Sequence, residues 1–233
     1  MIRLFVLILT TALFSTQAYA LHLTDRQVVL GGAIDVSNAQ KTSAKLLSMD
    51  AGAEAPIYLL VSSSRGTAQG VMLIADTVRS LKSPVVAVVQ TEVHGAGAAL
   101  AVMTDRLVMY RSSGLVFTEV SYQGVKKLKP PKKDAKEPPK EPTEKDKLLQ
   151  TVRQAYLDRF WGKVAGRLKM KAGKLNDKLA DGGFHWTSRQ TLKKKVAHSV
   201  VEKLLYTKLS EGKSEVKTTT TVKKARTVAP NGE

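Results

Sequence analysis

The sequence predicts an α/β protein with a parallel sheet, because short apolar runs alternate with segments of helical periodicity along residues 27–117. The apolar runs 27–30, 57–61 and 85–89 are rich in Val and Leu. Such runs are typical of strands that are covered on both faces, as in parallel sheets. Functional groups are then expected at the carboxyl ends of the strands.

The first two strands each lead into a helix. Strand 27–30 stops at a glycine pair, and Asp35 is placed to cap the helix that carries Ala39, Ala44, Leu46 and Leu47. Strand 57–61 runs into the polar turn 62–67, which contains Ser62, Ser63, Ser64, Arg65 and Gly66. The helix that follows this turn carries Val71, Ile74, Ala75, Val78 and Leu81.

The third unit is built around small residues. Pro84 opens strand 85–89, and glycine and alanine dominate residues 95–101. A helix of such residues can pack closely, because the missing side chains let backbones approach one another. Residues 107–110 and 115–117 are expected to form two further short strands.

Charge divides the 233 residues into two parts. The chain has 37 Lys and Arg, 20 Asp and Glu, a net charge of +17 and no Cys, which excludes a disulfide scaffold and a Cys-ligated metal or redox site. Residues 21–125 are neutral, whereas residues 126–233 carry +16. Aromatic residues are not interleaved with the Lys runs, and no nucleic-acid-binding motif is present. We therefore expect no sequence-specific nucleic-acid binding, and only weak, salt-sensitive binding to anionic surfaces.

Residues 1–20 have the pattern of a secretory signal peptide. Arg3 precedes an apolar run from Leu4 to Phe14, and 18–20 is a small-x-small cleavage site. The alternative is a membrane anchor, but the run is about half of the roughly 20 apolar residues that spanning requires. The expected mature protein begins at Leu21 and is periplasmic or secreted.

The basic part follows the α/β core, 21–125. Lys and Pro dominate 126–147, which is expected to be a disordered insert. Residues 148–208 are expected to complete the domain with helices, and 209–233 to form a disordered tail. One apolar face of the first helix packs on the body or on another subunit, or lies on an anionic membrane; it contains Leu149, Val152, Tyr156, Phe160, Val164 and Leu168.

Two strand ends place backbone N–H groups at the start of a helix: the turn at Gly66 and the stretch 93–97. Facing each other, these donors would form an oxyanion hole. The alternative is two ordinary glycine turns, and spacing alone does not exclude it.

At these residues the sequence resembles the Clp protease proteolytic subunit and the wider ClpP/crotonase superfamily. Segments 29–35 and 57–66 are similar to the family's opening strand and to its strand ending in Asn-Ser-Pro-Gly-Gly, and 95–105 resembles the crotonase glycine helix start. The resemblance implies a repeated β-β-α spiral fold with a helical handle at 148 onward, a closing helix over 186–205, and ring-type homo-oligomers that bind peptide or protein.

The family's peptidases use a Ser-His-Asp triad. The resemblance places Gly95 at the nucleophile position, Thr118 at the base position, and Gly182 or Gly183 at the Asp position, with Asp181 out of register. The triad side chains are then absent, while the oxyanion-hole backbone of Gly66 and Ala96 is kept. Arg65 replaces the first glycine of a Gly-Gly pair.

Other candidates for chemistry are few. Ala99 stands where crotonases often have a Glu, and Glu119 lies near their second carboxylate region. His94 could be a base only with a nucleophile partner, for which Ser62, Ser63, Ser64 and Thr67 are close in sequence; a structural, hydrogen-bonded His is the alternative. No carboxylate or second His is spaced to join it as a metal ligand. We expect no metal and no cofactor.

Three hypotheses follow from the sequence. The first is an exported ClpP-like pseudo-peptidase that acts as an oligomeric scaffold or binding subunit. The second is a divergent hydrolase that uses the retained oxyanion hole with another nucleophile. The third is a binder of polyanions or membrane surfaces through the basic half.

Overall fold

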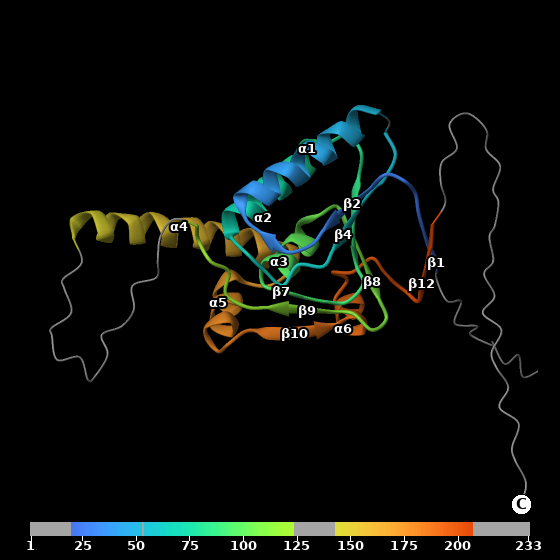
Figure 1. Ribbon diagram of the computed structural model, residues 1–233. Helices are drawn as coiled ribbons and strands as arrows, with labels where there is room; N and C mark the ends of the chain where they lie inside the picture. The colour runs from blue at the N-terminus through green and yellow to red at the C-terminus, as the bar shows by residue number, and fades with distance from the viewer. Residues whose placement is uncertain (1–19, 53, 124–142, 207–233) are drawn as a thin grey trace, which may run out of the picture.

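The computed structural model describes residues 20–52, 54–123 and 143–206 (Figure 1). A five-stranded parallel sheet forms the centre, with the strand order β11-β8-β6-β4-β2. The strands are β2 (Gln27–Leu30), β4 (Ile57–Val61), β6 (Val85–Val89), β8 (Arg106–Tyr110) and β11 (Ser199–Val201). The expected parallel α/β fold is confirmed, and all but β11 of these strands match apolar runs singled out in the sequence.

Helices cover one face of this sheet. They are α1 (Val36–Gly52), α2 (Ala68–Ser80) and α3 (Ala96–Met103), followed by the end of α4 (Glu144–Arg167). Asp35 caps α1 as predicted, since its Oδ1 accepts the N–H of Asn38 at 2.8 Å. Thr67, in the predicted polar turn, caps α2, and its Oγ1 accepts the N–H of Gly70 at 3.2 Å. The buried face of α1 differs from the expected one, since Ala44 and Leu47 are exposed and Thr42 and Ser43 are buried with Ala39 and Leu46.

The other face of the sheet is covered by a two-stranded ribbon of β1 (Ala20–Leu23) and β12 (Lys203–Tyr206). Strand β6 shows why both faces are apolar. Its residues Val85, Ala87 and Val89 join the core under the helices, whereas Val86 and Val88 pack in a second cluster with Leu23 of β1. Side chains alternate along a strand, so every residue of a central strand must be apolar when both faces are covered.

A smaller sheet carries the turn into α3. Its strand order is β10-β9-β7, formed by β7 (Glu92–His94), β9 (Gly114–Phe117) and β10 (Phe184–Thr187). β7 was not expected from the sequence, because it is short and carries two polar residues. A ribbon of β3 (Ala33–Ile34) and β5 (Arg65–Gly66) holds the turn at Gly66.

The basic part departs from the sequence prediction in two ways. Helix α4 begins at Glu144, inside the expected insert, where Thr143 and Asp146 form a capping box. The prediction of a closing helix over 186–205 is wrong. This region contains β10, the short α6 (Ser188–Lys193), β11 and β12, and α5 (Ala172–Ala180) precedes it. Residues of this region instead pair with β9, β8 and β1 as strands. The remainder of the insert and the tail lie outside the described residues.

Candidate functional site

Gly95 forms a sharp turn between β7 and α3. Its backbone has φ 47° and ψ −106°, and its N–H donates to Val116 O at 2.8 Å. A strand-to-helix turn of this kind exposes the nucleophile in serine hydrolases, at the expense of backbone strain. Glycine adopts this conformation without that strain and supplies no side chain.

Thr118 lies next to Gly95 and also next to Gly183. A Cβ built on Gly95 would be 3.1 Å from Thr118 Oγ1, and a Cβ built on Gly183 would be 3.2 Å from Thr118 Cγ2. The structure therefore brings Gly95, Thr118 and Gly183 into one row, although they come from three separate elements. Gly183 has φ 97°, and a Cβ there would overlap the carbonyl oxygen of Phe117.

Gly66 packs against the start of α3. A Cβ on Gly66 would lie 2.8 Å from Ala96 Cβ and 2.7 Å from Ile34 O, so only glycine fits between β3 and α3. Ala96 is the first residue of α3, and its N–H has no acceptor within the helix. The two segments singled out in the sequence, at Gly66 and at Ala96, are thus in contact at the carboxyl edge of the sheet.

Most nearby hydroxyls already serve the backbone. Ser63 is buried, and its Oγ lies 2.6 Å from Gly32 O and 2.8 Å from Arg65 O. Ser62 Oγ approaches Leu30 O at 3.4 Å, and Thr67 caps α2. Ser64 is exposed on the turn. These contacts give the serine turn a structural role.

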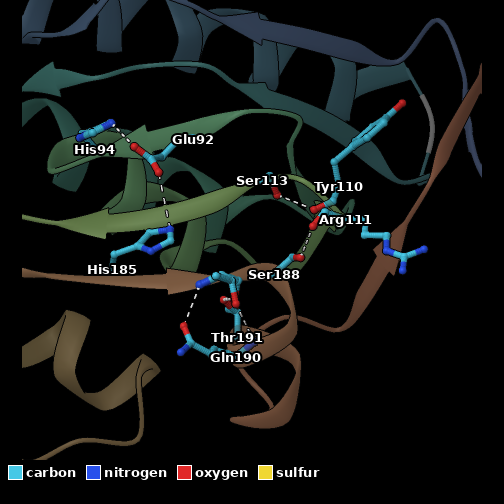
Figure 2. Close-up of polar contacts among 10 residues, drawn as sticks. Glu92, His94, Tyr110, Arg111, Ser113, His185, Ser188, Gln190 and Thr191 are labelled. Atoms are coloured by element: carbon cyan, nitrogen blue, oxygen red, sulfur yellow. Dashed lines mark hydrogen bonds and ion pairs between the residues drawn. The ribbon is translucent and has the colours of Figure 1, made fainter.

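His94 belongs to a polar cluster on the smaller sheet. Its Nε2 lies 2.9 Å from Glu92 Oε1, while Glu92 Oε2 lies 3.5 Å from His185 Nε2 (Figure 2). His185 reaches the carboxylate across Gly114, where any Cβ would overlap the imidazole. The sequence did not identify Glu92 and His185 as neighbours of His94. Recognition of 92–94 as a strand would have found Glu92, since residues i and i+2 share a face.

The cluster positions imidazoles but does not form a metal site. No group of three His, Cys, Asp or Glu side chains within 20–52, 54–123 and 143–206 is arranged to hold a metal ion. A Glu–His pair is the arrangement in which a carboxylate orients a base. All three side chains are 40–50% exposed, so solvent screens their interactions strongly.

A cavity of about 210 Å³ opens beside Glu119 and Val120, directly after Thr118. Helices α4 and α5 form its other wall, which combines the apolar side chains of Leu157, Trp161 and Leu179 with polar ones. The polar lining comes from Arg153, Gln154, Asp158 and Asn176. A concave site with an apolar wall and a few polar groups suits a side chain of a bound ligand.

The fold is that of a parallel α/β protein, and Gly95 forms the turn between β7 and α3 at one edge of its smaller sheet. Residues 12–117 match the family model for Clp protease. Among solved structures, a ClpP1 mutant from Listeria monocytogenes is similar with a TM-score of 0.60, covering 76% of this chain and 92% of the other at 14% identity. A search of curated proteins found no match.

The structural similarity establishes the fold, and the family model agrees with it. The chain therefore has a ClpP-like fold. In the part of the chain that the structure describes, no helix is long and apolar enough to cross a membrane.

Proposed function

We propose that this protein is an exported pseudo-peptidase, a non-catalytic subunit that assembles into oligomers and binds peptide or protein. One observation carries the proposal: Gly95 forms the turn between β7 and α3, where the family resemblance places the nucleophile, and glycine has no side chain. Without a hydroxyl or thiol there, no covalent intermediate forms at that position. The neighbouring Thr118 cannot replace a histidine base, since a hydroxyl accepts no proton near neutral pH.

The third position supports the same proposal. An Asp at Gly183 would overlap the Phe117 carbonyl, so this backbone leaves no room for an orienting carboxylate. The retained parts are those that bind: the contact between Gly66 and Ala96, and the cavity beside Glu119. We infer that a peptide segment occupies this cleft without being cut.

The exposed start of α4 supports assembly. Leu148 and Val152 are 64% and 49% exposed, whereas Phe160 on the same helix is fully buried. Figure 1 shows the first half of α4 extending away from the body. An apolar stripe that continues from the core onto a protruding helix favours packing against another subunit. Light scattering should give a mass above that of the monomer, and Leu148→Asp with Val152→Asp should lower it.

A fluorophosphonate probe tests the absence of catalysis. We expect no specific labelling of any Ser or Thr in the protein. The variant Gly95→Ser with Thr118→His places a hydroxyl beside an imidazole and should be labelled slowly, which shows that the probe reaches the cleft. Specific labelling of the natural protein would favour the divergent hydrolase, for which the Glu92-oriented His94 is the candidate base.

Export has its own test. We propose that cleavage follows Ala20, which is the first residue of β1 and pairs with Lys203. The mature chain would then begin at Leu21 and keep the rest of β1, including Leu23, which is buried in the second apolar cluster. Mass spectrometry of protein from the producing cell should find Leu21 as the first residue; an uncleaved chain would argue against export by this route.

A further inference from the structure

A second cavity, of about 300 Å³, lies at the opposite edge of the large sheet from Gly95. Asp105, directly before β8, and Leu107, within it, line this cavity, so it is at the amino ends of the parallel strands. The rest of its wall comes from the end of α4 and from the turn between α6 and β11. This site shares no lining residue with the row of Gly95, Thr118 and Gly183.

Positive charge dominates the lining of this cavity. Arg167, Lys169 and Lys195 contribute three cations, and no salt bridge involves them among the described residues. Asp105 is the one carboxylate among the lining residues, and its Oδ2 accepts the N–H of Val85 at 2.8 Å. The lining therefore has an excess of two positive charges over negative ones.

Lys169 and Lys195 both adopt a left-handed backbone conformation, which is unfavourable in free energy for a residue with a side chain. Lys169 has φ 54° and Lys195 has φ 56°, and these are the two non-glycine residues with positive φ in the described part of the chain. Each follows the end of a helix, α4 or α6, at a position where glycine is the usual residue. Side chains in this conformation are strained and persist mainly where they serve a function.

Helix capping does not explain the two lysine side chains. The N–H groups of Lys169 and Met170 donate to Gly166 O and Ala165 O, at 3.2 and 3.0 Å. After α6, the N–H groups of Lys195 and Val196 donate in the same way to Leu192 O and Thr191 O. Backbone donors thus satisfy these helix-end carbonyls, and glycine would provide them equally well.

His198 adds a neutral donor to the cavity. Its Nδ1 accepts the N–H of Leu107 at 3.1 Å, so the proton of the neutral ring is on Nε2. Burial lowers the pKa of His198, and Arg106, Arg167 and Lys169 lower it further. The ring therefore stays neutral beside the cations and can donate one hydrogen bond to an anion.

We propose that this cavity binds a phosphate group, with Arg167, Lys169 and Lys195 as its charged ligands. A phosphate carries up to two negative charges and presents several acceptor oxygens, which matches the excess of two positive charges and the available N–H donors. The same group can be free phosphate in solution or the headgroup of a phospholipid. The site is distinct from the basic segments 126–147 and 209–233.

Calorimetry on the full chain tests the proposal. Sodium phosphate titrated at constant ionic strength should bind to a saturable site, and Lys169→Gly with Lys195→Gly should weaken it by about tenfold or more. Arg167→Gln, within α4, should weaken it without changing a positive-φ position. The second arm measures co-sedimentation of the protein with phosphatidylcholine vesicles that contain or lack phosphatidylglycerol. If the protein sediments only with the anionic vesicles, and the same variants reduce that sedimentation, the ligand is a phospholipid headgroup.

The matched control is Lys41→Gln with Lys45→Gln, which removes two exposed lysines from α1. This control should bind phosphate and vesicles as the natural protein does. Equal affinity of the natural protein and the glycine variant in both arms would overturn the proposal. An equal loss in the control would also overturn it, because binding would then follow overall charge.

Discussion

The two edges of the central sheet use positive-φ positions in opposite ways. At the carboxyl edge, Gly95 and Gly183 occupy such positions, to which the family resemblance assigns triad side chains. At the amino edge, Lys169 and Lys195 occupy them, where glycine would relieve strain. A residue that holds a long side chain in this costly conformation is a candidate for a functional role. The contrast supports our proposal that the protein binds ligands without cleaving them.

The largest expected effect comes from restoring a carboxylate at the carboxyl edge. Gly183→Asp should lower the free energy of unfolding by about 3 kcal/mol, because positive φ is combined with overlap at the Phe117 carbonyl. Gly182→Asp is the matched control: its φ is also 97°, but nothing lies within 4 Å of its Cβ site, so about 1 kcal/mol is expected. Urea denaturation measures both. Equal losses would show that the overlap has no effect.

At the amino edge, substitution of a lysine by glycine should raise the free energy of unfolding, which is the opposite direction to the changes at Gly183 and Gly182. Lys169→Gly and Lys195→Gly should each raise the free energy of unfolding by about 0.5 kcal/mol, since relief of the left-handed backbone exceeds the entropy gained by the unfolded chain. Thermal and urea unfolding measure the change. A loss of stability in both variants would mean that the lysines serve the fold itself, and the contrast between the two edges would disappear.

A smaller effect concerns the pH dependence of stability. Burial and nearby cations hold the pKa of His198 below its usual value of 6.5. The unfolded chain therefore binds this proton at a higher pH than the folded chain does. The free energy of unfolding should fall as the pH drops below about 6.5, until the folded ring is also protonated.

His198→Asn should remove this part of the pH dependence, because its side-chain oxygen can still accept the N–H of Leu107 but does not titrate. Urea midpoints at neutral and mildly acidic pH, compared between the natural protein and the variant, provide the measurement. An unchanged difference between the two pH values would assign the effect to other groups.

The smallest expected effect concerns the exposed cluster at the carboxyl edge. Glu92→Gln should change the free energy of unfolding by less than about 0.5 kcal/mol, because solvent screens its contacts with His94 and His185. Chemical denaturation near neutral pH gives the value. A loss above about 1 kcal/mol would identify the cluster as a structural element of the smaller sheet.

Local patterns in the sequence predicted much of the main sheet and its helices. Apolar runs locate β2, β4, β6 and most of β8, the cap at Asp35 marks the start of α1, and the polar turn 62–67 precedes α2. Prediction failed where partners far along the chain decide the structure. The family resemblance implied a closing helix over 186–205, but pairing with β8, β9 and β1 makes most of this segment extended.

The sequence predicted only part of the candidate site, because some of its residues are brought together by segments that are far apart along the chain. The sequence singled out Gly66, Gly95, Ala96 and Thr118 through their positions at strand ends and through the family resemblance. It did not join His94 to Glu92 and His185, because β7 is short and polar and His185 arrives from β10. It also held no sign of the basic cavity, since Lys169 follows α4 and Lys195 follows α6, and only the fold brings both to the lining of one cavity.

By itself, the sequence determined the order of the main strands and of the first three helices, the neutrality of the α/β core and the absence of a side chain at Gly95. These properties follow from periodicity, composition and residue identity, which are local. The tertiary structure decided which residues face one another: Gly95 with Thr118 and Gly183 at one edge, and Arg167 with Lys169 and Lys195 at the other. Such contacts depend on chain closure over long separations, which no local pattern encodes.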